Sequence, residues 1–230
     1  MKRETELRIL RELMSQLDDN RNIDAGAQYR LPTSDYVCPD LAKAEWTAFF
    51  REHPQLIGLS GDLPEAGSFF TTDDFGVPVL ATRDEDGRFR AFVNACRHRG
   101  ARVAQEAKGT ARRFVCPFHS WAYTSSGALH AVPDEDHFGG VDKACMGLLE
   151  LPSEEKAGLL FVHPQPGAVL DVEALLGTEL LSELEGWGFA DYIHVADLDI
   201  DKKLNWKLAN DTFGETYHFP KLHRNTLGQL

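Results

Sequence analysis

The sequence lacks any long apolar run, and no stretch approaches the roughly 18 to 20 apolar residues that a membrane-spanning helix needs. Residues 1–17 carry charges throughout, which excludes a secretory signal and makes a cytoplasmic protein the expectation. Four cysteines in 230 residues are too few for a disulfide framework, and Cys38 and Cys145, which stand outside any motif, are interpreted as reduced thiols. Lys and Arg total 24 against 36 Asp and Glu, so neither a nucleic acid nor a membrane is expected as a partner.

What the chain does have is enough apolar side chains, 43% of all residues, for a packed core. Apolar residues recur at helical spacing through residues 1–20, which predicts an amphipathic helix. Residues 21–40 are polar and irregular. A second helix is predicted over residues 41–52, where Pro54 prevents its continuation.

Residues 68–132 change to short runs typical of β-strands. The turn signal at residues 84–87 joins VPVLATR to RFRAFVNA as a predicted hairpin. A further strand, ARRFVC, follows, and residues 125–127 turn the chain again. The run at residues 158–163 is expected to close this small antiparallel domain.

Two prolines at positions 164 and 166 mark a boundary, after which the pattern becomes mixed. Residues 171–184 look helical, residues 193–207 alternate like a strand, and residues 208–219 look helical. The predicted class is therefore α+β, with a small antiparallel β domain followed by an incomplete α+β domain of the helix-grip kind. The expected domains are a helical segment at 1–54, the β domain at 55–166 and the start of the second domain at 167–230.

The first chemical motif reads C-R-H-R-G and then C-P-F-H-S-W, placing Cys96, His98, Cys116 and His119 on two loops. Two thiolates and two imidazoles suit a [2Fe-2S] cluster in which two histidines ligate one of the irons. A structural zinc ion also accepts this ligand set. However, zinc sites usually pair Cys with Cys on one turn and His with His on another, whereas each loop here mixes the two.

The second motif is NWKLANDTFGETYHFPKLH. If a helix starts near residue 208, Asp211, Glu215 and His218 lie at i, i+4 and i+7 on one face. On an ideal helix His223 would point roughly 140° away from His218, but the proline between them lets the chain turn back. Two imidazoles and a carboxylate form the facial triad of non-heme Fe(II) oxygenases. A surface helix with one packed face is the alternative.

Together these motifs resemble the α subunit of Rieske non-heme iron (ring-hydroxylating) oxygenases, from about Ala44 to the end of the chain. The respiratory-chain Rieske proteins are less similar, because they carry a disulfide at the positions of Ala101 and Phe118. They also place a cluster-bonding Ser where this chain has Trp121, although Tyr123 matches their Tyr. Fewer hydrogen bonds to cluster sulfur imply a lower reduction potential.

The resemblance implies roles for particular residues. Glu215 matches the acidic residue that links a Rieske histidine of one subunit to an iron-binding histidine of the next, a position that is more often Asp. Asp211 is a further candidate on the same segment, but no Asp or Glu follows His223, where the family has its third iron ligand far downstream. The chain is therefore expected to be an N-terminal portion of such a subunit, without turnover of its own. The implied ligands are Cys96, His98, Cys116 and His119 for the cluster, and His218 and His223 for the iron.

The resemblance also implies the cofactors and partners. Electrons would come from NAD(P)H through a flavin reductase or ferredoxin, pass through the cluster and reach a mononuclear Fe(II). The iron would use O2 to hydroxylate, dihydroxylate or demethylate a small organic substrate. A head-to-tail homotrimer, with a possible β subunit, is expected. The alternatives are a Rieske electron carrier without its own oxygenase activity and a zinc-stapled binding module.

Overall fold

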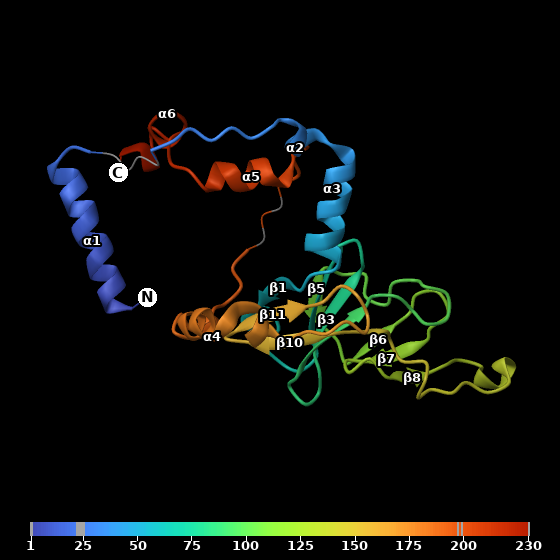
Figure 1. The fold of residues 1–230 in the computed structure, drawn as a ribbon. Helices are drawn as coiled ribbons and strands as arrows, with labels where there is room; N and C mark the ends of the chain where they lie inside the picture. Colours follow the sequence, from blue (N-terminus) through green and yellow to red (C-terminus); the bar gives the residue numbers. More distant parts are fainter. Residues whose placement is uncertain (1, 22–25, 197, 199, 230) are drawn as a thin grey trace. The chain divides into compact units, whose positions relative to one another are not determined.

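A computed structural model describes residues 2–21, 26–196, 198 and 200–229 of the chain (Figure 1). The chain divides into two compact units, a larger one of residues 45–196 and a smaller one of residues 1–44 with 197–230. All strands found in the described residues belong to the larger unit.

Three antiparallel sheets make up the larger unit. They are a three-stranded sheet in the order β1 (Gln55–Leu59), β11 (Leu159–Val162) and β10 (Ser153–Lys156), a five-stranded sheet in the order β5 (Lys108–Thr110), β2 (Ser68–Thr72), β3 (Val79–Arg83), β4 (Phe89–Val93) and β9 (Glu150–Leu151), and a three-stranded sheet in the order β6 (Arg113–Val115), β7 (Ala122–Thr124) and β8 (Leu129–Ala131). The predicted antiparallel β domain and its closing strand are confirmed.

The predicted hairpin is the pair β3 and β4, joined by a turn that Asp84 holds in place. Its carboxylate accepts hydrogen bonds from the N–H groups of Asp86 and Arg88 and from Nε of Arg90, at 3.0, 2.8 and 2.7 Å. Burial alone would raise the pKa of Asp84, but these hydrogen bonds lower it below its ordinary value. A buried, ionised carboxylate therefore organises the turn that the sequence predicted.

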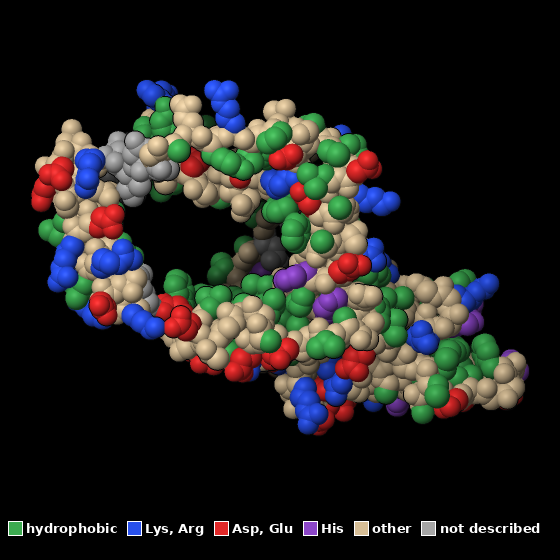
Figure 2. Space-filling model, in the orientation of Figure 1, with side chains coloured by type: hydrophobic (Ala, Val, Ile, Leu, Met, Phe, Trp, Pro, Cys, Tyr) green, Lys and Arg blue, Asp and Glu red, His purple; other side chains and the backbone are tan. Residues whose placement is uncertain are grey.

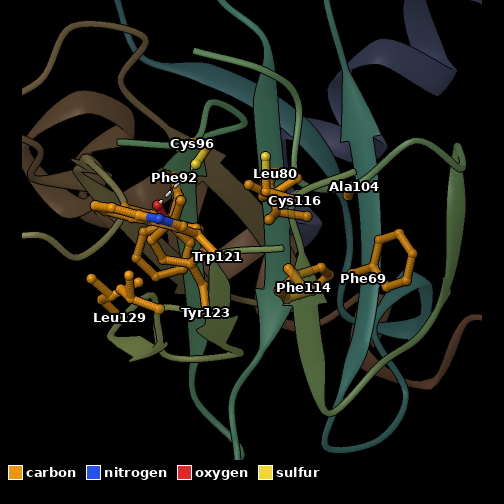
Figure 3. Packing of buried hydrophobic residues seen from close by; sticks show 13 residues of the cluster. Phe69, Leu80, Phe92, Cys96, Ala104, Phe114, Cys116, Trp121, Tyr123 and Leu129 are labelled. Carbon is orange, nitrogen blue, oxygen red and sulfur yellow. Dashed lines mark hydrogen bonds between the residues drawn. The ribbon is translucent and has the colours of Figure 1, made fainter. Parts of the chain in front are cut away.

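The hydrophobic core divides into three clusters, and the largest lies beneath the two Cys/His loops (Figure 3). Aromatic rings of the sheets, including Phe92, Phe114 and Tyr123, pack there with the cysteines Cys96 and Cys116. The two predicted ligand cysteines are thus part of the core, which restricts their side chains to one orientation.

One helix covers the three-stranded sheet that contains β11. This helix, α4 (Val172–Glu185), buries Val172 against Leu159 and Phe161, and Asp171 caps its start by accepting a hydrogen bond from Ala174 N at 2.9 Å. The predicted helix at 171–184 is confirmed, although Gly177 interrupts its helical dihedral angles. Residues 167–196, assigned by sequence to the second domain, pack in the larger unit, and the domain boundaries stay a prediction.

The remaining regular elements are helices. The predicted N-terminal helix is confirmed over Arg3–Asp18, and the helix predicted at 41–52 is an α-helix that continues as a π-helix. These elements are α1 (Arg3–Asp18), α2 (Ser34–Val37), α3 (Pro39–Glu45), the π-helix η1 (Trp46–Arg51), α5 (Trp206–Phe213) and α6 (Phe219–Leu222), with short 3-10 turns at Ser60–Asp62, Glu135–Phe138, Phe189–Asp191 and Leu227–Gln229.

Two sequence predictions in the C-terminal part are wrong. The described residues of 193–207 form no strand, and two positions of that stretch, 197 and 199, lie outside the described residues. Alternation alone does not make a strand, because backbone N–H and C=O groups also need a neighbouring strand edge. The helix predicted at 208–219 instead starts at Trp206, with Asn205 as its cap, and ends at Phe213 before Gly214. Asp211, Glu215 and His218 therefore do not share one helical face.

The helices of the described residues are too short or too polar to span a lipid bilayer.

Stability of the larger unit is expected to fall in acid through His163. This side chain is 5% exposed, and its Nδ1 accepts a hydrogen bond from Gln165 N at 3.2 Å. Burial is the largest cause that lowers the pKa of His163 below its ordinary value. The folded state therefore resists a proton that the unfolded chain takes up near pH 6.5, so stability is present above about pH 6.5 and is lost as the pH falls below it.

Urea unfolding at pH 7.5 and pH 5.5 measures this effect. His163→Gln should show a smaller loss of unfolding free energy between the two pH values than the parent chain. His130→Gln, at an exposed position, is the control and should lose as much as the parent. An equal loss in all three proteins would show that His163 carries none of the acid sensitivity.

Candidate metal centre

The first Cys/His loop leaves β4 and closes on itself. The N–H of Cys96 donates to the carbonyl of Ala101 at 2.8 Å, and the N–H of Gly100 donates to the carbonyl of Cys96 at 2.9 Å. Asn94, which is buried, fixes the loop's exit by accepting hydrogen bonds at 3.0 Å from the N–H groups of residues 103–104. The loop is therefore held by its own backbone hydrogen bonds and by the side chain of Asn94.

The second loop repeats this backbone arrangement after β6. The N–H of Cys116 donates to the carbonyl of Trp121 at 2.8 Å, and the N–H of Ser120 donates to the carbonyl of Cys116 at 2.9 Å. In both loops the cysteine is bonded to the fourth and fifth residues after it. Two matching loops thus present one cysteine and one histidine each, as expected for a group bound from two sides.

In each loop the fourth residue after the cysteine has a positive φ, which is +76° at Gly100 and +57° at Ser120. This conformation disfavours a residue with a Cβ by about 1 to 2 kcal/mol, although glycine also loses more backbone entropy on folding. We therefore expect Ser120→Gly to raise the free energy of unfolding by about 0.5 to 1 kcal/mol, and Gly100→Ala to lower it by a similar amount.

Urea unfolding of both variants tests the expectation. A Cβ built on Gly100 has nothing within 4 Å, so the alanine variant reports backbone conformation without a steric clash. Changes of the same sign in the two variants would contradict the proposed strain at Ser120.

In both loops the cysteine is more deeply buried than the histidine. Cys96 and Cys116 are 4% and 2% exposed and form no disulfide, whereas His98 is half-buried and His119 is exposed. The two imidazole rings lie together, with centroids 4.7 Å apart. Burial, followed by the charge of His119, lowers the pKa of His98, which favours the neutral imidazole that metals bind.

Tyr123 packs beneath the loops with its hydroxyl directed at Cys96, as the dashed line in Figure 3 marks. Its hydroxyl lies 3.2 Å from Sγ of Cys96 and accepts a hydrogen bond from the N–H of Arg97 at 3.0 Å. Burial and then the contact with Cys96 raise the pKa of Tyr123, so the phenol keeps its proton. It can therefore donate a hydrogen bond to a cysteine thiolate that binds metal.

Trp121 is buried against the outer side of His98. The indole and imidazole rings stack at 5.0 Å with an angle of 11°, and Phe138 contacts both rings edge-on. In the described part of the chain, Nε1 of Trp121 is the buried side-chain polar atom without a hydrogen-bond partner. A buried donor left free by the protein is compatible with a bound group or a water molecule beside the two loops.

The residues of the two loops fit a [2Fe-2S] cluster. The donor set is two sulfurs inside and two imidazoles outside, as an iron bound by two cysteines and an iron bound by two histidines require. Among the described residues, no three or more His, Cys, Asp or Glu side chains are grouped as ligands of one metal ion. The cluster is compatible with this finding, because each of its irons takes two protein ligands.

The second predicted site brings three of its four candidates together. The rings of His218 and His223 lie 5.3 Å apart, because the single turn of α6 between them ends at His223. Glu215 accepts hydrogen bonds from the backbone N–H of His218, at 3.2 Å, and from its Nδ1. The contact with His218 lowers the pKa of Glu215. The two imidazoles therefore lie side by side, but Pro220 does not break a longer helix as predicted, because α5 already ends at Phe213 and Pro220 lies in the first turn of α6.

Asp211 lies apart from this group in its contacts. Its carboxylate accepts a hydrogen bond from the hydroxyl of Tyr36 at 2.7 Å. The backbone carbonyl of Tyr36 in turn accepts from Asn205 Nδ2 at 2.9 Å. These bonds tie α5 to α2 within the smaller unit.

Three residues at the site were missed from the sequence as functional candidates. Asn94, Trp121 and Phe138 act through buried or stacked contacts that no ligand spacing reveals. The only local signal was an Asn at a strand end, two residues before a cysteine.

Both candidate sites lie in regions that match known protein families. The sequence profile of the Rieske [2Fe-2S] domain matches residues 53–150, and that of the ring-hydroxylating α subunit catalytic domain matches residues 189–229. The glycine betaine monooxygenase oxygenase subunit of Chromohalobacter salexigens is 31% identical over 205 residues, covering 88% of this chain and 45% of that protein. Biphenyl 2,3-dioxygenase subunit alpha of Rhodococcus jostii is 35% identical over 207 residues, covering 82% and 42%.

The fold is shared as well. A crystal structure of the quaternary ammonium Rieske monooxygenase CntA with an inhibitor has a TM-score of 0.76 and 25% identity, covering 85% of this chain and 55% of that one. The chain spans less than half the length of these two curated relatives.

Proposed function

We propose that this chain, a member of the Rieske non-heme iron oxygenase α-subunit family, is the electron-receiving and iron-binding portion of an oxygenase. The whole protein would use reductase-derived electrons and O2 to hydroxylate, dihydroxylate or demethylate a small organic substrate. The observation that carries the proposal is the pair of matching loops, which present two buried thiols and two adjacent imidazoles.

Within the loops, Cys96 and Cys116 would hold one iron, and His98 and His119 the other. The bound cluster supplies one-electron transfer. The burial of the cysteines keeps water from their sulfurs, and Tyr123 donates a hydrogen bond to Cys96 Sγ. The exposed ring of His119 leaves an edge open toward a partner.

In the smaller unit, His218 and His223 would bind the mononuclear iron. Glu215 occupies Nδ1 of His218, which leaves Nε2 of that ring for a metal. The same carboxylate would face a Rieske histidine of a neighbouring subunit. Asp211, engaged by Tyr36, would hold α5 in place rather than bind iron.

The partners belong to the proposal too. A flavin reductase or ferredoxin fed by NAD(P)H would deliver electrons, in a cytoplasmic setting. A homotrimer of full-length subunits, with or without a β subunit, would bring one subunit's cluster near the next subunit's iron.

Electron paramagnetic resonance of the anaerobically purified, dithionite-reduced chain, with iron and zinc analysis, tests the proposal. We expect an average g below that of all-cysteine clusters and about two irons per chain. If the parent chain binds more than two irons and the His218→Ala variant loses the excess, the second site is at His218. Reduction without substrate-dependent O2 uptake in the full-length protein would instead indicate an electron carrier. A silent spectrum with one tightly bound zinc would contradict the proposal.

A further inference from the structure

The N-terminal segment contacts the helix before the second site through one tyrosine. Tyr36 lies in the single turn of α2, outside the residues that either family profile matches. Its hydroxyl donates a hydrogen bond to Oδ2 of Asp211 at 2.7 Å, across 175 residues of sequence. Its backbone carbonyl accepts a hydrogen bond from Nδ2 of Asn205 at 2.9 Å. Asn205 caps the start of α5 and Asp211 lies in its last turn, so Tyr36 contacts both ends of this helix.

The contacts at the start of α5 do not depend on the tyrosine hydroxyl. The ammonium group of Lys207 lies 5.6 Å from the centre of the Tyr36 ring and donates a hydrogen bond to the backbone carbonyl of Asp35. Asn205 accepts a hydrogen bond from the N–H of Lys207 at 2.9 Å through Oδ1, while its Nδ2 binds Tyr36. A phenylalanine at position 36 would keep the ring and the backbone carbonyl, so it would remove only the hydrogen bond to Asp211.

The last turn of α5 lies at the surface of the smaller unit. The helix has eight residues, none of them buried, and Figure 2 shows charged and hydrophobic side chains side by side over it. A helix this short is marginal on its own, and helices fray from their ends. The hydrogen bond from Tyr36 to Asp211 therefore limits fraying in the turn that leads to the second site.

This turn leads directly to the histidine pair. The backbone carbonyl of Asp211 accepts a hydrogen bond from the N–H of Gly214 at 3.1 Å, where α5 ends. Glu215 follows, and it accepts hydrogen bonds from the backbone N–H of His218, at 3.2 Å, and from its Nδ1. The position of Glu215, and of the imidazole that it contacts, is thus set by the end of the helix that Asp211 holds.

We propose that Tyr36 is a positioning residue for the mononuclear-iron site, and that its hydroxyl acts through Asp211 to hold the segment that carries His218. This proposal rests on the proposed function and adds a residue that neither ligand spacing nor the matched family profiles single out. The role is one of geometry, because the phenol donates a hydrogen bond and no covalent bond changes. Loss of the hydroxyl should therefore weaken metal binding while every ligand stays in the chain.

Cobalt(II) binding to the cluster-loaded chain tests the proposal, since cobalt(II) accepts imidazole ligands as iron(II) does. Equilibrium dialysis should find about one cobalt ion per chain that His218→Ala no longer binds. Tyr36→Phe should raise the dissociation constant about 5-fold, the loss expected for one hydrogen bond. Tyr29→Phe, at a position that is 86% exposed, is the matched control and should change it less than about 2-fold.

Variants of Asp211 separate a positioning role from a general loss of stability. Asp211→Asn keeps a carbonyl oxygen that can accept from the Tyr36 hydroxyl, and its dissociation constant should stay within about 2-fold of the parent value. Asp211→Ala should bind about 5-fold more weakly than the parent. The double variant Tyr36→Phe/Asp211→Ala should bind no more weakly than that, because both changes remove the same hydrogen bond.

Every other result counts against the proposal. An unchanged affinity in Tyr36→Phe, or an equal loss in Tyr29→Phe, would remove the role of the hydroxyl. A loss of about 25-fold in the double variant would show that the two side chains act independently. Loss of cobalt binding in Asp211→Asn would make Asp211 a metal ligand instead. A parent chain that binds no cobalt, or a His218→Ala variant that keeps it, would refute the iron site of the proposed function itself.

Discussion

Replacing Cys116 with Ser is expected to remove the low-g resonance of the reduced chain and the roughly two irons that accompany it. The side chain is 2% exposed, and the loop's hydrogen bonds hold it in the core opposite Cys96. A serine hydroxyl is a poor substitute for a thiolate on iron, and the rigid loop cannot supply another donor. Iron analysis and electron paramagnetic resonance on the variant measure the loss.

Two cysteines of the same chain serve as matched controls. Cys38 and Cys145 are free and lie outside the loops, and Asp142 Oδ2 accepts a hydrogen bond from the thiol of Cys145. Cys38→Ser and Cys145→Ser should keep the signal and the iron at the parent level. Retention of a Rieske signal by Cys116→Ser, or its loss in a control, would overturn the ligand assignment.

The second large effect concerns the segment that leaves the β unit. Gly158, in the turn between β10 and β11, has a φ of +79°, and a Cβ there would lie 2.2 Å from the backbone nitrogen of Ala190. Gly61 is approached as closely, since its Cβ would meet the carbonyl oxygen of Tyr192 at 1.8 Å. Both glycines let residues 189–192 lie directly on the β unit.

Gly158→Ala is therefore expected to lower the free energy of unfolding by about 3 kcal/mol, combining backbone strain with a clash between main-chain atoms. The alternative to global loss is release of residues 189–192 from the unit. Urea unfolding and hydrogen exchange of that segment measure the two effects.

Gly87→Ala separates the two causes. Gly87 has a nearly equal φ of +77°, but nothing lies within 4 Å of its Cβ position. Its variant should lose only about 1 kcal/mol and leave exchange at residues 189–192 unchanged. Equal losses in Gly87→Ala and Gly158→Ala would show that the close approach to Ala190 contributes nothing.

Local signals in the sequence predicted most of the β unit. The hairpin of β3 and β4 follows from a turn sequence whose Asp84 carboxylate satisfies nearby N–H groups, and such bonds form between close neighbours in the chain. The predicted extent of the helix at 208–219 was wrong for a reason that is also local. Gly214 ends the helix, and Glu215 then accepts a hydrogen bond from the N–H of His218, although the apolar periodicity continues past this point. The strand predicted at 193–207 was wrong because an alternating pattern does not show whether a neighbouring strand is close enough to pair with it.

By itself the sequence determined which side chains could bind metal and in which order they follow one another. Cys and His are the ligands that metal chemistry selects, and their spacing within each loop can be read directly from the sequence. It also indicated that the chain would turn near Pro220 and bring His223 beside His218, although the ligand roles of these two residues stay a prediction. Only the tertiary structure decided how deep each donor lies, since burial depends on sheets distant in sequence. It likewise decided that Tyr123 contacts Cys96 and that Trp121 stacks on His98. Those contacts join residues from separate loops, and only packing of the whole unit brings them together.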